Sequence, residues 1–312
     1  MISGIVLAGL PATGKTSYLA LLFYAIVEER ADGLRLGRFD DDRERITEIS
    51  DVLLATNVAD HTTVDLEQDI TLSLRYDGVD FVLNIPDLSG ETWEHALVDR
   101  RWSHALALEI ADATGFIMFV HCKGINDGLT IVDAEQAAAA LLGDNAPNDW
   151  AEDERNEEPG EATDAHVADP TEADTADESG VHDSDDEDEE KHCRQLTQVS
   201  LIELMQFFVA ASSCPIRVSL VISAWDLEPK RLHPQEWLSK NAPMLAQFLE
   251  LNTDDVEATV WGVSAQGADW SDEQVREEYK DKDPIERAMI HAADGTVVGV
   301  AAPLRWVLRL DQ

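Results

Sequence analysis

The stretch that decides the fold is ISGIVLAGLPATGKT, residues 2–16. Residues 2–8 are almost all apolar and include Val and Ile, which is typical of a strand buried on both faces of a parallel sheet. Residues 9–16, GLPATGKT, fit the pattern G-x-x-x-x-G-K-[ST], and the sequence that follows predicts a helix from about residue 16 to residue 29. Strand, Gly-rich turn and helix in this order predict a loop that holds the phosphates of a nucleotide.

The chemistry of this loop follows from its residue types. Its glycines permit backbone geometry that is closed to other residues, so that successive N–H groups and the helix N-terminus converge on phosphate oxygens. Lys15 is expected to reach the β- and γ-phosphates, and the Thr16 hydroxyl to hold Mg²⁺. The residues expected to bind the phosphates are Gly9, Ala12, Thr13, Gly14, Lys15, Thr16 and Ser17.

A second candidate site follows a predicted hairpin. Residues 70–74 and 81–85 alternate apolar and polar residues around the turn pair Asp77-Gly78, which indicates two antiparallel strands. The sequence DLSG comes next, residues 87–90. Because ligands bind at the carboxyl ends of strands in α/β sheets, Asp87 is expected to take a Mg²⁺-bound water and Gly90 to present its N–H to a γ-phosphate.

A polar loop before the hairpin contains Thr62 and Thr63. One of these hydroxyls is expected to close over the nucleotide and add to the metal's ligands. The sequence does not decide between the two, and we take Thr63 as the candidate.

The base-recognition candidates stand at the ends of two later strands. SAWD, residues 223–226, ends the run IRVSLVIS, and Asp226 is placed to accept two hydrogen bonds from the N1–H and 2-amino group of guanine, a pattern that adenine lacks. SAQ, residues 264–266, ends the next strand. The backbone amides of Ser264 and Ala265 are expected near the guanine O6.

The remaining pattern predicts a fold of the α/β class. Further helices are expected over residues 38–54, 94–111, 193–211, 234–251, 284–291 and from residue 303, a loop over 55–68, and further strands over 115–121, 216–223 and 256–263. Strands separated by crossover helices give three layers, a mostly parallel central sheet with helices on both faces. The hairpin adds one antiparallel edge.

Charge divides the chain. It carries 23 basic and 63 acidic residues, a net charge of −40, and residues 144–192 alone hold 21 acidic residues against Arg155 and Lys191. This segment has almost no apolar content, so we expect a disordered insert between the two parts of one domain, residues 1–143 and 193–312. Double-stranded nucleic acid and anionic lipid are poor partners for such a chain, because their binding depends on clustered Lys and Arg.

Cysteine content and hydropathy bear on location. Three scattered cysteines form no disulfide framework, which favours a reducing cytoplasm. The apolar run 18–27 is far shorter than the roughly 20 residues of a membrane span, so neither an export signal nor an anchor is expected. The nine histidines, including His121 beside Cys122, lack partners at metal-ligand spacing, and core or surface roles are expected for them.

With GLPATGKT, Thr62 or Thr63, DLSG, SAWD and SAQ in this order, the chain resembles Ras-like, translation-factor-related P-loop GTPases. The resemblance covers residues 1–143 and 193–267. It implies GTP and GDP as ligands, Mg²⁺ as cofactor, slow hydrolysis with Lys15, Thr63 and Glu91 at the reacting phosphate, and movement of loops near 55–68 and 88–102. The Glu after DLSG and the terminal APLRW look similar to bacterial double-GTPases of conflict and defence systems, which implies a protein effector or a second GTPase as partner.

Two positions depart from the Ras-like pattern. Ala224 replaces the Lys whose aliphatic stem covers the base, so guanine preference rests mainly on Asp226. Glu91 replaces the water-orienting Gln and cannot donate to the γ-phosphate, which predicts slow or partner-dependent hydrolysis. These departures leave two alternatives to a switch open: an interaction scaffold that binds nucleotide without turnover, and a P-loop ATPase or kinase.

Overall fold

A computed structural model describes residues 2–37, 70–85, 90–125, 196–212, 215–228, 232–269, 273–279 and 281–310. These residues belong to one unit, built from residues 1–127 and 194–312. The expected helix over 38–54, the loop over 55–68 and the acidic insert over 144–192 lie outside the described residues.

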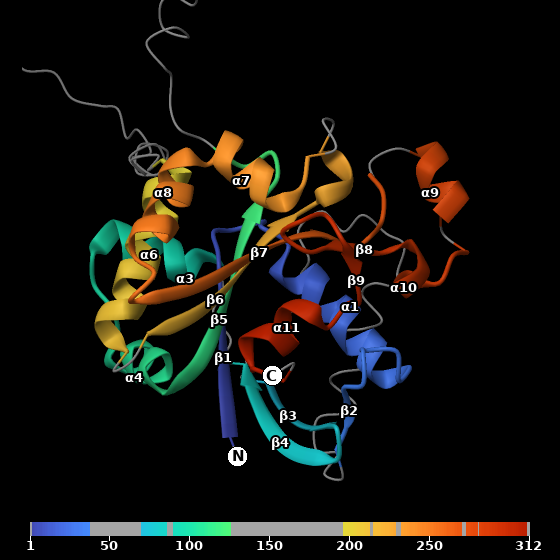
Figure 1. The fold of residues 1–312 in the computed structure, drawn as a ribbon, viewed down its shortest axis with the longest axis horizontal. Coiled ribbons are helices and arrows are strands. Elements are labelled where there is room, and N and C mark those ends of the chain that lie inside the picture. The colour runs from blue at the N-terminus through green and yellow to red at the C-terminus, as the bar shows by residue number, and fades with distance from the viewer. Residues whose placement is uncertain are drawn as a thin grey trace, which may run out of the picture. The chain divides into compact units, whose positions relative to one another are not determined.

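Within the described residues, nine strands make one sheet (Figure 1). They are β1 (Ile2–Ala8), β2 (Arg35–Leu36), β3 (Ile70–Tyr76), β4 (Val79–Ile85), β5 (Ala113–His121), β6 (Ile216–Ser223), β7 (Val256–Ser264), β8 (Met289–His291) and β9 (Val297–Val298). Their order is β2-β3-β4-β1-β5-β6-β7-β8-β9. The five strands from β4 to β7 in this order are parallel to one another, whereas β2, β3, β8 and β9 pair antiparallel at the two edges.

Helices cover both faces of the sheet (Figure 1). They are α1 (Lys15–Val27), α3 (Gly90–Asp99), α4 (His104–Asp112), α6 (Thr197–Ala211), α7 (Pro234–Asn241), α8 (Pro243–Leu251), α9 (Glu273–Tyr279), α10 (Pro284–Arg287) and α11 (Ala302–Val307), with a 3-10 turn, η3, at Trp225–Leu227. The expected three-layer α/β fold is confirmed, as are the opening strand, the hairpin and the three later parallel strands.

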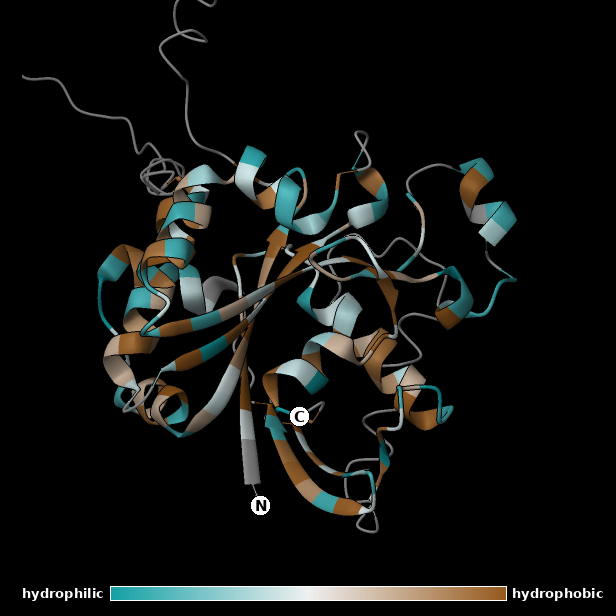
Figure 2. Ribbon diagram, in the orientation of Figure 1, coloured by the Kyte–Doolittle hydropathy of each residue, from teal (hydrophilic) through white to brown (hydrophobic). Residues whose placement is uncertain are grey.

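The central strands are buried on both sides because successive side chains point to opposite faces. In β1, Ile5 and Leu7 join the cluster packed under α1 and α11, whereas Val6 and Ala8 join the cluster under α3, α4, α6, α7 and α8. Hydrophobic residues follow the strands, while α9 at the outside is mostly hydrophilic (Figure 2). This double burial explains the unbroken apolar run at the start of the sequence.

Three predicted helices were wrong in extent. The helix expected over 94–111 is two helices, because Arg100 adopts a left-handed φ of 49° and the Ser103 side chain caps α4 by accepting from the Leu106 N–H. The helix expected over 234–251 breaks before Pro243, which lacks the N–H that a continuing helix needs. The helix expected over 284–291 ends at Arg287, and residues 289–291 instead pair with β7. The antiparallel strands β2, β8 and β9 were not predicted.

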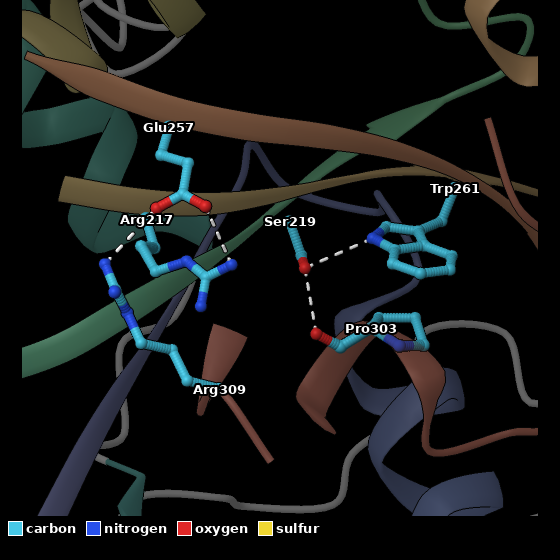
Figure 3. A network of polar contacts seen from close by, with 6 residues as sticks. All are labelled: Arg217, Ser219, Glu257, Trp261, Pro303 and Arg309. Atoms are coloured by element: carbon cyan, nitrogen blue, oxygen red, sulfur yellow. Dashed lines mark hydrogen bonds and ion pairs between the residues drawn. The ribbon is translucent and has the colours of Figure 1, made fainter. Parts of the chain in front are cut away.

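The C-terminal helix α11 is fixed to the sheet by a polar network (Figure 3). Buried Ser219 on β6 donates to the Pro303 carbonyl at 2.8 Å and accepts from the Trp261 indole N–H at 3.2 Å. Beside it, the buried guanidinium of Arg217 lies 4.1 Å from the centre of the Trp306 ring and pairs with Glu257. The terminal sequence APLRW therefore packs against the strand that carries the SAWD motif.

Candidate functional site

The loop between β1 and α1 has the backbone geometry that its glycines suggested. Gly9 and Gly14 have positive φ values of 154° and 83°, and Ala12 lies in the left-handed region at 57°. A Cβ atom on Gly9 would lie 2.8 Å from the Thr13 hydroxyl, which leaves no room for a side chain. The loop thus depends on glycine at this position.

Lys15 and Thr13 hold the loop closed on itself. The Lys15 ammonium donates to the carbonyls of Gly9 (2.8 Å) and Leu10 (3.1 Å), and the Thr13 hydroxyl donates to the Leu10 carbonyl at 2.8 Å. Helix α1 begins at Lys15 with no side-chain cap and no acidic residue in its first turn. Its first amides and its positive dipole end therefore face the loop, an arrangement that favours an anion.

The base-recognition candidates meet at the ends of β6 and β7. Ala224, between β6 and η3, has a left-handed φ of 50°, and its carbonyl accepts from the Cys122 thiol at 3.0 Å. Burial raises the pKa of the Cys122 thiol to about 11, so the thiol remains a donor at neutral pH. This bond and the tight turn place Asp226 at the carboxyl edge of the sheet.

Ser264 connects the two motifs. Its fully buried hydroxyl donates to one Asp226 carboxylate oxygen and accepts from the Gly267 N–H at 3.0 Å. A carboxylate has about four lone-pair sites, so Asp226 keeps acceptor capacity on both oxygens after Ser264 has taken one site. The geometry suits a ligand with two adjacent N–H donors.

One pocket of about 260 Å³ joins the phosphate-loop motif to the base-recognition motifs. Its walls come from β5, β6 and β7 and the segments that follow β6 and β7, from the loop after β1, and from α1. They include Ala12, Gly14 and Ser17 of the loop and helix, Ser223, Ala224 and Asp226 of SAWD, and Ala265 and Gln266 of SAQ. The structure therefore brings together three of the five predicted motifs. The phosphate loop, residues 9–16, is more than 200 residues from SAWD and SAQ in the sequence.

Of the other two motifs, only Gly90 of DLSG is among the described residues. Asp87, Thr62 and Thr63 lie outside the described residues, and nothing is described of the Glu91 side chain. Gly90 is the first residue of α3. Two residues after Glu91, the fully buried Trp93 donates its indole N–H to the Leu7 carbonyl at 3.2 Å, which ties α3 to the strand that leads into the phosphate loop.

Sequence reasoning missed several residues of the pocket. Its apolar floor contains Tyr18, Phe119 and Val263, and its rim contains His121, Leu227, Ala268 and Asp269. Burial raises the pKa of Tyr18 well above its usual range, so its hydroxyl stays neutral and bonds to the Val300 carbonyl at 3.3 Å. Of these, His121 carried a usable signal, because it is the last residue of a buried parallel strand.

The described residues present neither a metal-binding cluster nor a membrane-spanning helix. They contain no group of three or more His, Cys, Asp or Glu side chains that could hold a metal ion. None of the described helices combines the length and apolar character needed to cross a bilayer.

A parallel sheet with a phosphate-loop motif after its first strand defines the class of P-loop nucleotide-binding proteins. Comparison with known families gives the particular branch: the profile of Double-GTPase 1 matches residues 6–307, so the chain belongs to the Double-GTPase 1 family. The resemblance to P-loop GTPases of the double-GTPase type is thereby confirmed, and the guanine nucleotide is its expected ligand.

Other comparisons add little. No curated protein matches the chain. Among solved structures, it is similar to Roco2 RocCORdC of Methanosarcina barkeri bound to GDP, at 10% identity and a TM-score of 0.31. That match covers 96% of this chain and 52% of the other, so the chain spans about half the length of that protein.

Proposed function

We propose that this protein is a molecular switch that binds GTP with Mg²⁺ and hydrolyses it slowly to GDP. The observation that carries the proposal is the single pocket lined by both Gly14 of the phosphate loop and Asp226 of the base motif. A guanine nucleotide placed there puts its phosphates at the start of α1 and its base at the ends of β6 and β7. Ligands of α/β sheets bind at this edge.

The phosphates are held by the amides of residues 12–17 and by Lys15. Thr16, in the first turn of α1, offers a hard hydroxyl oxygen of the kind that Mg²⁺ prefers, so the described part of the site fits this ion. Asp87 and Thr63 would complete the ligand set. When bound, Mg²⁺ would neutralise charge on the β- and γ-phosphates.

Hydrolysis depends on the segment that begins α3. The Gly90 N–H would meet the γ-phosphate, and Glu91 would accept a hydrogen bond from the attacking water. Glu91 cannot donate to the phosphate, and its charge opposes that of the phosphate, so we expect slow turnover unless a partner supplies a cation. An arginine supplied in this way is worth about 10³ to 10⁵ in rate.

Switching would follow from the same segment. Loss of the γ-phosphate would release the segments near 55–68 and 88–102, and the second of these contains α3, which the Trp93 indole ties to the Leu7 carbonyl. We propose a protein effector or a second GTPase as the partner, in a bacterial conflict or defence system, and the cytoplasm as the location.

A nucleotide-binding scaffold without turnover is the second candidate, and Glu91 together with Ala224 favours it. An ATPase or kinase is opposed by Asp226, because adenine cannot supply the two N–H donors that this carboxylate accepts. The affinities for GTP and ATP, measured in competition with Mg²⁺ present, separate the guanine-specific functions from the ATPase. We expect GTP to win by at least about tenfold, the effect of one such hydrogen bond.

Phosphate release then separates a switch from a scaffold. We expect slow release from GTP by the full chain, faster release with a cognate partner, and none after Lys15→Ala. Equal affinity for GTP and ATP would remove the guanine assignment. If no phosphate release is measured with or without a partner, the scaffold is the remaining candidate function.

A further inference from the structure

The position of β5 in the sheet draws attention to its last residue, His121. In the strand order, β5 lies between β1, which leads into the phosphate loop, and β6, which leads into SAWD. His121 is the register partner of Ser223, the first residue of SAWD. A nucleotide that spans from the phosphate loop to Asp226 must therefore pass over the end of β5, at His121.

The side chain of His121 faces this path. It is half-buried and lines the same pocket as Gly14 and Asp226. Two residues earlier on the same face of β5, Phe119 also lines the pocket, so the strand contributes a ring at its floor and an imidazole at its rim.

The hydrogen bonds of the His121 imidazole leave its Nε2 atom for a ligand. The Lys123 backbone N–H donates to His121 Nδ1 at 3.1 Å, so in the neutral ring the proton is on Nε2. Burial, together with Lys123, lowers the pKa of His121, while Asp226 opposes this shift. Within the described part of the chain, no residue accepts a hydrogen bond from Nε2.

We propose that His121 is a nucleoside-binding residue whose Nε2–H donates to the sugar or the purine of the bound guanine nucleotide. The proposal deepens the proposed function and depends on it. It also fits the departure at Ala224: this chain lacks the lysine that covers the base in Ras-like proteins and has an additional polar group beside this position, at the end of the neighbouring strand β5. The proposal assigns His121 no contact with the phosphates, which the proposed function puts at the start of α1.

Three variants separate a hydrogen bond from packing. His121→Ala removes ring and donor, His121→Phe keeps a ring without a donor, and His121→Gln keeps a side-chain N–H donor. By calorimetry on the full chain with Mg²⁺, we expect GDP to bind about 3- to 10-fold more weakly to the Ala and Phe variants, the effect of one neutral hydrogen bond. We expect the Gln variant to bind within about twofold of the wild type.

Inorganic tripolyphosphate serves as the probe for the phosphate half of the site. It should compete equally well against all four proteins. Repeating the titrations with 2′-deoxy-GDP locates the hydrogen bond. If the Ala and Phe variants bind this ligand as well as the wild type does, the acceptor is the 2′-hydroxyl. If they still bind it more weakly, the acceptor is another oxygen of the sugar or the purine. Both results support the proposal.

Two results overturn the inference. In the first, the wild type binds GDP but the Ala and Phe variants bind it equally well. In the second, all three variants lose affinity for GDP and tripolyphosphate alike, which indicates a structural role for the imidazole. A wild-type protein that binds neither GDP nor GTP is a different outcome, since it removes the proposed function itself.

Discussion

The Ser264 hydroxyl holds the carboxylate of Asp226 in place at the proposed base site. A substitution of Asp226 therefore tests the preference for guanine. Asp226→Asn replaces one acceptor oxygen with an NH₂ donor, which opposes the 2-amino group of guanine but donates to the 2-oxo group of xanthine, while the remaining oxygen still accepts the N1–H of either base. We expect GDP affinity to fall about 100-fold, because hydrogen bonds to a charged group contribute about 1.5–3 kcal/mol each, and XDP to become the better ligand. Competition binding measures both.

Lys15→Ala is the matched control for this experiment, since it should weaken GDP and XDP equally. A GDP-to-XDP preference that Asp226→Asn leaves unchanged would remove Asp226 from the base site.

Two half-buried imidazoles make stability depend on pH. Burial lowers the pKa of His121 and of His291 below the ordinary value of 6.5. The unfolded chain therefore binds more protons than the folded one just below pH 6.5, and the folded state loses stability as the pH falls from 6.5 through the lowered folded pKa. Between about pH 7.5 and about pH 5.5, we expect His121→Gln to lose less unfolding free energy than the wild type, measured by urea titration. Identical losses in the two proteins would contradict the assigned shift at His121.

At the scale of elements, helices and strands with a distinct local sequence pattern were predicted from the sequence. Elements that depend on pairing with a distant strand were missed. The run 2–8 was predictable because a strand buried on both faces is almost entirely apolar. The hairpin around Asp77-Gly78 was predictable because a strand buried on one face alternates apolar and polar residues. The break between α3 and α4 was not, because Arg100 takes a left-handed conformation that glycine usually signals. Residues 289–291 form a strand only because the edge of β7 is available to them.

The candidate site likewise combines residues that a local sequence pattern marks with residues that only the sheet brings there. The three motifs around the pocket were readable because each has a fixed spacing, and the sheet order predicted that their strand ends lie together. His121 has no motif around it. Its one signal in the sequence is its position at the end of a buried parallel strand, and the strand order adds that this strand lies between those of the phosphate and base motifs.

Docking of α11 provides an element-scale prediction. Ser219→Ala removes the buried partner of both the Pro303 carbonyl and the Trp261 indole. Each buried polar group left unpaired costs about 1–3 kcal/mol, so we expect about 2–4 kcal/mol of destabilisation. Arg309→Ala removes a largely exposed ion pair with Glu257 and should cost less than about 1 kcal/mol. Equilibrium urea unfolding ranks the two, and an equal or reversed ranking would mean that the buried network does not hold α11.

The whole molecule is dominated by its charge, and almost half of that charge lies in residues 144–192. The described unit buries a hydrophobic cluster on each face of its sheet, and the composition of residues 144–192 predicts little apolar surface to add to these clusters. We therefore expect a variant with residues 144–192 replaced by a short Gly-Ser linker to fold and to bind GDP with the affinity of the full chain.

The same variant tests how self-repulsion acts on the folded state. Its net charge falls from −40 to −21, because the segment carries 21 acidic and two basic residues. Salt screens repulsion beyond a Debye length of about 10 Å at about 0.1 M, so salt should stabilise the full chain by reducing its self-repulsion. Raising NaCl from about 20 mM to about 300 mM should increase the Tm of the full chain more than that of the shortened one. An equal increase in both would show that the acidic segment is too far extended, or too well hydrated, to act on the folded domain, and failure of the shortened chain to fold would make the segment part of that domain.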